Sequence, residues 1–386
     1  MKLKVQKSQI IDGLLKAAAV LPSKAGAAYL RSLWLRAKDG SLAIMATDAN
    51  IEFVGSYPAD IEKEGLVGIP GLSFVDLVRK LPDGQIELSA DDGASSILVK
   101  EGRKSYKLPV NGPEWFQEFS AFPEDSPVIW TGEVFMDILS RVPFCIDDDD
   151  AREATSCICF KPRGGDRLDI CGLNGHQFAL VSYIQPDLCA KLGDSDLLIQ
   201  KKYLPDIRKW LDPNEIEINL SDKRLYLKGK NGAESLSVPR AHFSYPDYNL
   251  FMSKLDEPGI SELNLSRKEA IDSLGRISIF NTDTDRCVFM DLGAPELKLS
   301  AEGADIGSAM EELEVDYAGS LKKIAFPTKS LMEIFGHFNS DRMNMLFTGA
   351  EGPCGVKGSD PEDRDYIVII MPMKVSDKTY YSEEDD

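Results

Sequence analysis

The side chains of this sequence best suited to chemistry are seven cysteines and three histidines, and their spacing argues against a metal site. A zinc site needs two closely spaced pairs of ligands. No cysteine belongs to a CxxC pair, and the three histidines (His176, His242 and His337) are far apart. Cys157 and Cys159 alternate along a strand-like segment, so both point to one face, as structural thiols do. We expect no metal, no cofactor, and reduced cysteines in a cytoplasmic protein.

Motifs for catalysis are missing as well. An enzyme needs a nucleophile with a base, or paired carboxylates in a cleft. The sequence holds no GxSxG elbow, no P-loop and no HExxH motif. It therefore predicts a protein that is not an enzyme.

Composition bounds the remaining classes. The chain has 386 residues, of which 43% are hydrophobic and 28% charged, as in a soluble globular protein of two or three domains. The N-terminus does not resemble a signal peptide, and no apolar run is long enough to span a membrane. The net charge is -19, from 44 basic and 63 acidic residues. By itself this charge disfavours binding to nucleic acid or anionic lipid.

Three kinds of sequence anchor recur with a period near one third of the chain, which indicates an internal repeat. The first anchor is an amphipathic helical segment with a carboxylate at its eighth position (Asp76, Asp206 and Glu333). The second is a polar turn after a strand, at residues 46–50, 172–176 and 301–305. The third pairs residues 105–109 with 235–239. Order and spacing are kept together in all three, so we expect three repeats.

Each repeat is predicted to contain two helices separated by strands. Apolar residues at i, i+3 and i+4 predict helices at residues 8–20, 71–81, 132–144, 200–211, 266–280 and 328–338. Alternating residues predict strands between them, as at 41–46, 85–89 and 224–228. Each repeat thus reads helix, strands, helix, strands, which is an α+β unit of two similar halves. Pro and charged residues mark boundaries near 123–127 and 256–259.

The acidity is not uniform along the chain. With the first helix counted from Lys7, the six predicted helices together carry a net charge of +5. The other residues therefore carry -24, which gives the total of -19. If these helices share one surface, that surface is positive within a negative shell. Alternatively, Lys and Arg gather there only because they are good helix formers on solvated faces.

These features resemble the bacterial DNA polymerase III beta subunit, the sliding clamp family. The resemblance covers the chain up to about Val375 and rests on three repeats and three short motifs: the Gly175-His176 turn, Tyr245-Pro246-Asp247-Tyr248 and Met371-Pro372-Met373-Lys374. It implies three DNA-clamp domains at residues 1–125, 126–256 and 257–375, followed by an acidic tail at 376–386. Members of the family form head-to-tail homodimeric rings of six such domains, with helices lining a central hole and sheets outside.

The resemblance implies a processivity factor that encircles double-stranded DNA and slides on it. Basic residues of the inner wall would make loose phosphate contacts that do not read sequence. The candidates are Lys24, Arg79, Lys80, Arg141, Arg152, Lys201, Lys202, Arg208, Lys209, Arg267 and Lys268. Two departures from the family pattern bear on this: Leu72 and Ser73 replace a frequent Arg-Lys pair, and Asp147 to Asp150 form an acidic run that would repel phosphate.

A second implied site is a pocket for short linear motifs of the replicative polymerase, other DNA polymerases, the clamp loader and repair proteins. The matching positions are Thr155, Leu173, Gly175, His176, Gln177, Phe178, Pro246, Leu250, Phe251, Pro327, Ser330, Ile369, Ile370, Met371, Pro372, Met373 and Lys374. Met and Pro in its wall suit peptides with Leu or Phe anchors. The usual turn, Thr-Asp-Gly-His-Arg-Leu, here reads Leu-Asn-Gly-His-Gln-Phe and lacks the Arg. His176 either contacts the peptide or is a turn residue hydrogen-bonded to the backbone.

Ring closure is implied to join Tyr106 and Leu108 of one subunit to Ile279 and Phe280 of the other. Such a head-to-tail contact suits an exposed edge strand. The tail could screen the nearby pocket or simply be solvated. The alternative function is a non-enzymatic scaffolding repeat protein of the same fold that does not encircle DNA.

Overall fold

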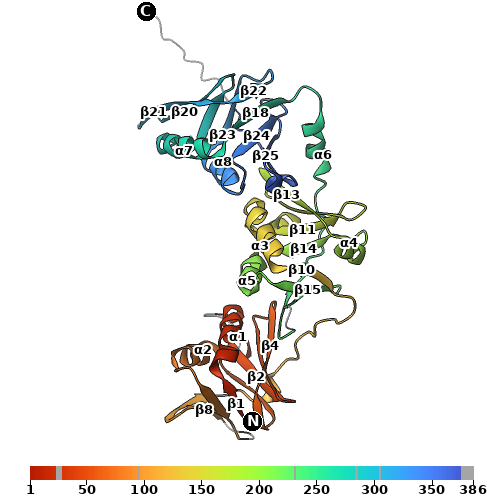
Figure 1. The fold of residues 1–386 in the computed structure, drawn as a ribbon, viewed down its shortest axis with the longest axis vertical. Coiled ribbons are helices and arrows are strands. Elements are labelled where there is room, and N and C mark those ends of the chain that lie inside the picture. The colour runs from red at the N-terminus through yellow and green to blue at the C-terminus, as the bar shows by residue number, and fades with distance from the viewer. Residues whose placement is uncertain are drawn as a thin grey trace, which may run out of the picture. The chain divides into compact units, whose positions relative to one another are not determined.

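A computed structural model describes residues 1–22, 28–91, 93, 95–229, 232–282, 286–303 and 306–374. Lys24, residues 304–305 of the second anchor and the tail at 376–386 lie outside the described residues. The chain divides into two compact units, and Figure 1 shows their helices and strands. Unit 1 contains residues 1–139 and 199–242, and unit 2 contains residues 140–198 and 243–386. Each unit is described by itself below.

Unit 1 contains two antiparallel sheets. Its strands are β1 (Lys2–Gln6), β2 (Ser32–Lys38), β3 (Ser41–Thr47), β4 (Glu52–Pro58), β5 (Asp60–Lys63), β6 (Gly65–Pro70), β7 (Gln85–Ser89), β8 (Ser96–Glu101), β9 (Lys104–Pro109), β10 (Val128–Thr131), β15 (Glu215–Leu220), β16 (Arg224–Gly229) and β17 (Glu234–Pro239). One sheet has the order β5-β1-β7-β8-β9, and the other has the order β10-β15-β16-β17-β4-β3-β2-β6. The second sheet joins the first repeat to the second through the β17–β4 pair.

The helices of unit 1 pack against these sheets. They are α1 (Lys7–Val20), α2 (Gly71–Lys80), α5 (Leu204–Trp210) and most of α3 (Gly132–Arg141), with short 3-10 turns η1 (Ala28–Arg31), η2 (Pro113–Trp115) and η5 (Lys201–Tyr203). Ile10, Leu14 and Ala17 of α1 are fully buried, which is the apolar stripe that an amphipathic helix presents to a core.

Unit 2 also contains two antiparallel sheets. Its strands are β11 (Cys157–Pro162), β12 (Arg167–Leu173), β13 (Gln177–Ile184), β14 (Leu197–Gln200), β18 (Ser261–Ser266), β19 (Cys287–Asp291), β20 (Glu296–Gly303), β21 (Gly307–Glu314), β22 (Asp316–Ala318), β23 (Lys323–Pro327), β24 (Arg342–Phe347), β25 (Cys354–Gly358) and β26 (Tyr366–Ile370). The orders are β14-β11-β12-β13-β26-β25-β24-β18-β22 and β21-β20-β19-β23. The β13–β26 pair joins the second repeat to the third.

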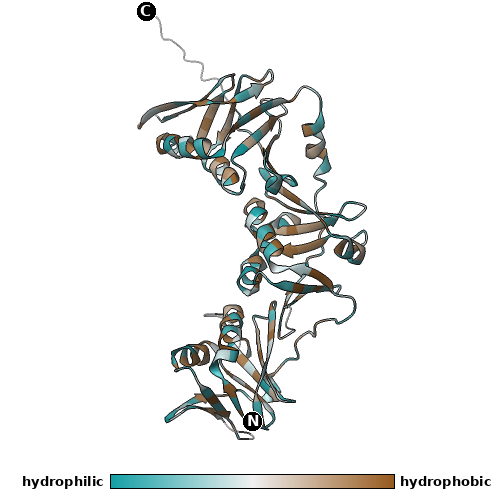
Figure 2. Ribbon diagram, in the orientation of Figure 1, coloured by the Kyte–Doolittle hydropathy of each residue, from teal (hydrophilic) through white to brown (hydrophobic). Residues whose placement is uncertain are grey.

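The helices of unit 2 are α4 (Pro186–Leu192), α6 (Asn249–Met252), α7 (Arg267–Ile277) and α8 (Thr328–Gly336). The 3-10 turns are η3 (Pro143–Cys145), η4 (Asp150–Ser156), η6 (Ser253–Asp256), η7 (Ser278–Phe280) and η8 (Pro361–Asp363). The hydroxyl of Ser266 accepts the amide of Glu269 and caps the start of α7. Figure 2 shows both hydrophilic and hydrophobic residues along α7 and α8, as amphipathic helices require.

The strand orders confirm an α+β fold built from a repeated unit. In each repeat a first strand leads into a helix, as β1 leads into α1, β10 into α3 and β18 into α7. Three later strands join that first strand in one sheet: β7-β8-β9, β15-β16-β17 and β24-β25-β26. Four further strands form the second half of each repeat, in the orders β4-β3-β2-β6, β14-β11-β12-β13 and β21-β20-β19-β23, and the second helix (α2, α5 or α8) follows them. Strands β5 and β22 are additional and pair with the first strands β1 and β18.

The six predicted helices are confirmed, but three features differ from the sequence expectation. Each repeat begins with a strand, not with a helix, because four to six alternating residues before each helix already pair in a sheet. The segments 200–211 and 266–280 mix 3-10 and α turns. Helices α4 and α6 were not predicted, because seven and four residues are too short to show a periodic pattern. No helix among the described residues is long and apolar enough to cross a membrane.

Candidate functional site

A glycine turn at the start of β13 forms one side of the predicted peptide site. The side-chain oxygen of Asn174 accepts hydrogen bonds from the amides of His176 (3.1 Å) and Gln177 (2.9 Å). Gly175 has a φ of +85°, a conformation that glycine adopts without steric cost. His176 is exposed at the tip of this turn. The Asn174 side chain thus fixes the turn locally and presents His176 to solvent.

The segment after β26 is attached to this turn and to the third repeat. Strands β13 and β26 pair antiparallel, with Gln177 opposite Ile370 and Phe178 opposite Ile369. Beyond the strand, the Met371 amide donates to the His176 carbonyl (2.9 Å), and the Met373 amide donates to the Ala325 carbonyl (2.8 Å). The backbone of residues 371–373 is therefore held between a turn of the second repeat and β23 of the third.

An aromatic cluster lies beneath the surface that this segment borders. Phe178 is buried, stacks on Tyr248 (centroids 5.1 Å apart) and meets Phe251 edge to face (5.0 Å). The Tyr248 hydroxyl donates to the buried Asp169 (3.0 Å). Burial and the Asp169 carboxylate raise the pKa of Tyr248, so its hydroxyl remains a donor. Tyr248 and Asp169 were not among the predicted site residues, although Tyr248 stands in the Tyr-Pro-Asp-Tyr motif.

Apolar side chains at several of the predicted positions remain exposed to solvent. Leu250, Met371 and Met373 are 72%, 38% and 39% accessible. Phe251 and Pro327 are half-buried. We call these five residues the apolar surface. Of the other predicted positions, Gln177, Phe178, Ile369 and Ile370 are buried in the sheet, and Leu173, Pro372 and Ser330 are half-buried; Pro246 and Lys374 are exposed. Thr155 lies on η4, where its hydroxyl donates to the Arg152 carbonyl.

Most of the predicted DNA-contacting cations are exposed. Arg79, Lys80, Arg152, Lys202, Arg208, Lys209 and Lys268 are exposed, whereas Lys201 and Arg267 are half-buried. Three form local ion pairs: Arg79 with Asp76 (3.0 Å), Lys209 with Asp206 (3.3 Å) and Arg152 with Asp147 (3.1 Å). The Arg152 pair offsets one charge of the acidic run at 147–150. Exposed pairs of this kind are weak, so these cations remain able to contact phosphate.

Arg141 is a correction to the predicted set. Its side chain is only 7% accessible and lies 2.6 Å from the buried carboxylate of Asp363. Its guanidinium also covers the ring of Tyr366 (5.0 Å to the centroid). Arg141, which belongs to unit 2, is therefore bound to η8 of the same unit and does not face solvent. Arg267 is partly engaged in the same way, because its Nε donates to the Ser340 carbonyl (2.7 Å).

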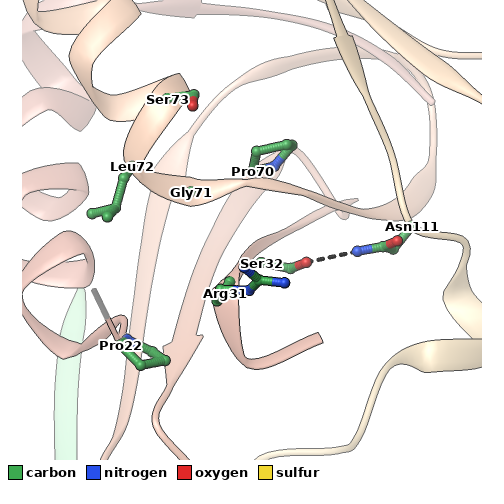
Figure 3. Close-up of a pocket in the computed structure, with 8 residues that line it drawn as sticks. All are labelled: Pro22, Arg31, Ser32, Pro70, Gly71, Leu72, Ser73 and Asn111. Carbon is green, nitrogen blue, oxygen red and sulfur yellow. Dashed lines mark hydrogen bonds between the residues drawn. The ribbon is translucent and has the colours of Figure 1, made fainter. Parts of the chain in front are cut away.

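A cavity in unit 1 lies where the resemblance placed an Arg-Lys pair. It has a volume of about 290 Å³, and Figure 3 shows Leu72 and Ser73 at its edge, at the start of α2. The Asn111 side chain donates to the Ser32 hydroxyl (2.8 Å) on another side of it. Arg31 is the charged residue among the eight that line this cavity. The cavity is separate from the predicted peptide site, whose residues all belong to unit 2.

Strands β9 and β21 each lie at the edge of a sheet. Strand β9, with Tyr106 and Leu108, pairs only with β8, and strand β21 pairs only with β20, among the described strands. Tyr106 and Leu108 are half-buried although their partners Val99 and Ile97 are fully buried. Ile279 is exposed on η7, and Phe280 is half-buried. Ile306 lies just before β21 and Met310 lies within it, and both are exposed apolar residues. Strand β21 was not among the strands predicted from the sequence, although the sequence shows an acidic run there, with Glu311, Glu312 and Glu314.

Comparison with known proteins identifies relatives along the whole chain. Residues 1–120 match the family model of the DNA polymerase III beta subunit, N-terminal domain, and residues 259–374 match the model of its C-terminal domain. The beta sliding clamp of Caulobacter vibrioides is 22% identical over 379 residues, which cover 97% of this chain and all of that protein. The beta sliding clamp of Streptomyces coelicolor is 24% identical, again over 97% of this chain and all of that protein.

A solved structure shares the fold. The DNA polymerase III subunit beta of Pseudomonas aeruginosa has a TM-score of 0.86 and 20% sequence identity, and the match covers 97% of this chain and 100% of that chain. A likeness at this identity establishes a common fold. The two matched family models together cover more than half of the chain, at residues 1–120 and 259–374.

Proposed function

The chain belongs to the DNA polymerase III beta subunit family, and from this membership we propose that it is a sliding clamp, a processivity factor that encircles duplex DNA. A sliding clamp catalyses no reaction; it holds a polymerase on its template. We propose that residues 1–125, 126–256 and 257–375 are its three clamp domains and that two chains form the ring. A protein with this role acts on the chromosome, which agrees with a cytoplasmic location in a bacterium.

The pairing of strands between repeats is the observation that supports ring closure best. The last strand of the second repeat, β17, pairs antiparallel with β4 of the first repeat. The last strand of the third repeat, β26, pairs antiparallel with β13 of the second. Strands β4 and β13 occupy the same position within their repeats, as does β21 in the third. The same rule therefore assigns β9, the last strand of the first repeat, to β21 of another chain.

The two edges are complementary in charge. Strand β9 carries exposed Lys104 and Lys107, whereas β21 carries exposed Glu312 and Glu314. Tyr106 and Leu108 supply an apolar face on one side, and Ile279 supplies one on the other. Backbone pairing of edge strands, apolar burial and opposite charges act together in such a contact. Because the two surfaces differ, the contact is head to tail, and two chains close a ring if the rotation allows it.

The exposed cations support DNA binding that is independent of sequence. Lys202, Arg208 and Lys209 lie within ten residues of one another on η5 and α5. Lys and Arg contacts to phosphates are electrostatic and exchangeable, so they permit sliding. The negative charge of the remaining chain opposes binding to the outside of the ring.

The apolar surface supports tethering of partners through short peptides. Its Leu and Met side chains are exposed, Phe251 packs on the buried Phe178, and Met adapts its shape to different anchors. We propose that the replicative polymerase, the clamp loader and repair proteins bind here through segments carrying Leu or Phe.

The test is retention on circular DNA. The purified protein, assembled on nicked circular duplex by its clamp loader, should remain bound through gel filtration and dissociate when a restriction enzyme linearises the DNA. Equal retention on circular and linear DNA would contradict encirclement and favour a scaffolding role. The control is a second circle that carries bound blocking proteins on both sides of the restriction site. After cutting, its ends are blocked, so the clamp should be retained.

A further inference from the structure

We propose that residues 375–386 of this chain dock on its own apolar surface through Tyr380 and Tyr381 and compete with partner peptides. This inference rests on the proposed function, because it assumes that the apolar surface is the peptide site. The segment is VSDKTYYSEEDD. It combines two adjacent aromatic residues with a run of four acidic residues.

The segment is additional to the family fold. The family model of the C-terminal domain ends at Lys374, and the Caulobacter relative is matched over its full length while 97% of this chain is covered. The chain therefore supplies twelve residues for which the clamp fold has no structural need. Such an addition is free to carry a function of its own.

The segment begins at the rim of the apolar surface. Lys374 directly follows Met373, whose amide is held by the Ala325 carbonyl, so the starting point of the segment is fixed. Tyr380 is six positions after Lys374, so at about 3.3 Å per residue it lies at most about 20 Å from Lys374. This length of chain lets the tyrosines turn back onto Met373 and Met371, which stand one and three positions before Lys374.

Tyrosine suits this surface chemically. Leu250, Met371 and Met373 are partly exposed, so a docking ring gains apolar contact while its hydroxyl stays in water. The thioethers of Met371 and Met373 also contact aromatic rings favourably. Partner anchors of the Leu or Phe type need the same side chains, so occupation by Tyr380 or Tyr381 and occupation by a partner exclude each other.

Tethering makes even weak docking significant. A short connection between a ligand and its site gives an effective concentration in the millimolar range. At an effective concentration of about 2–9 mM, a segment with a dissociation constant of about 1 mM would leave its site free for only about a third to a tenth of the time. A competing peptide binds only the free site, so its apparent affinity falls in proportion to the fraction of sites that remain free. We expect a reduction of about three- to tenfold.

The experiment compares the full chain with a chain ending at Val375. A fluorescent peptide from the replicative polymerase should bind the shortened chain about three to ten times more tightly in fluorescence anisotropy. The double variant Tyr380→Ser/Tyr381→Ser in the full chain should reproduce most of this gain. The matched control Ser376→Ala/Ser382→Ala should leave the affinity of the full chain unchanged. Equal affinity of the full and shortened chains overturns the proposal.

A second measurement separates this proposal from the clamp function. A labelled synthetic peptide of residues 375–386 should bind the shortened chain, and unlabelled polymerase peptide should displace it. The variant Leu250→Ser should weaken both peptides. If only the polymerase peptide binds, docking of the tail is refuted while the peptide site stands. If neither binds, the assignment of the apolar surface fails, and with it this proposal, whereas retention on circular DNA still tests encirclement.

Discussion

The guanidinium of Arg141 and the carboxylate of Asp363 form a buried ion pair, 2.6 Å apart, between the end of α3 and η8. The same carboxylate accepts the hydroxyl and amide of Ser340 and the amide of Asn339. The Tyr366 hydroxyl donates to the Arg141 carbonyl (2.7 Å). The Asp363 side chain thus joins Arg141 of the second repeat to residues 339–340 of the third, within the unit that carries the apolar surface.

Replacing Asp363 with Ala should lower the free energy of unfolding by about 3–5 kcal/mol, since removal of one partner leaves a buried charge unpaired. Urea titration followed by circular dichroism measures this loss. The double variant Arg141→Met/Asp363→Ala should recover part of it. The exposed pair Asp76–Arg79 provides the control, because Asp76→Ala should cost no more than about 1 kcal/mol. An equally small effect at Asp363 would contradict a structural role for the pair.

The same network predicts the direction of an acid transition. Burial alone would raise the pKa of Asp363, but the hydrogen bonds from Ser340, Arg141 and Asn339 outweigh it, so the pKa is lowered. A lowered folded-state pKa stabilises the fold above the unfolded value of about 3.9. This stabilisation is lost as the pH falls further, through the folded-state pKa. Wild type should therefore lose stability in this range more steeply than Asp363→Asn, as measured by thermal unfolding at each pH.

His337 predicts a second pH dependence, closer to neutrality. Its ring stacks on Phe144 (centroids 4.0 Å apart), and burial lowers its pKa from 6.5 despite a hydrogen bond to the Ser140 backbone and the nearby Glu333. Below pH 6.5 the unfolded chain binds a proton that the folded chain resists, so stability falls as the pH decreases. His337→Phe should keep the stack and flatten this slope between about pH 7 and 5. The same substitution at exposed His242 is the control, and an unchanged slope in His337→Phe would contradict the assignment.

Local patterns predicted the helices well, because the apolar positions of each helix lie within one short stretch of sequence. Ile10, Leu14 and Ala17 of α1 are buried at the expected spacing. The anchors at 105–109 and 235–239 correctly marked equivalent last strands, β9 and β17. Arg141 was assigned wrongly because its partner, Asp363, lies 222 residues away, and no local pattern records such a pair. The edge position of β21 escaped notice for the same reason: pairing between strands is a property of the fold.

Neutralising cations of α5 should weaken DNA binding without changing sequence preference. Removal of one phosphate contact reduces the slope of log affinity against log salt by about 0.9. Arg208→Gln/Lys209→Gln should therefore lower both the affinity for duplex DNA and this slope, as measured by anisotropy at several salt concentrations. Lys38→Gln removes one charge from the β2–β3 hairpin and should leave the slope unchanged. If Lys38→Gln lowers the slope about half as much as the double variant does, net charge and not the helix surface governs binding.

Charge reversal tests the proposed pairing of β9 with β21 across two chains. Lys104→Glu/Lys107→Glu places acidic residues opposite Glu312 and Glu314, so the dimer should dissociate at least about tenfold more readily, equivalent to about 1.4 kcal/mol. Sedimentation equilibrium measures this change. The converse variant, Glu312→Lys/Glu314→Lys, should weaken the dimer in the same way.

Combining both reversals in one chain gives the decisive comparison. Each edge then meets the opposite sign again, so the dimer should return towards wild-type affinity, although neither variant alone dimerises well. Lys63→Glu reverses one charge on β5, at the opposite edge of the same sheet as β9, and should leave the dimer intact. If the combined variant does not recover, the two edges do not contact each other. Recovery would assign β9 of one chain to β21 of its partner, because only a direct contact lets two unfavourable changes cancel.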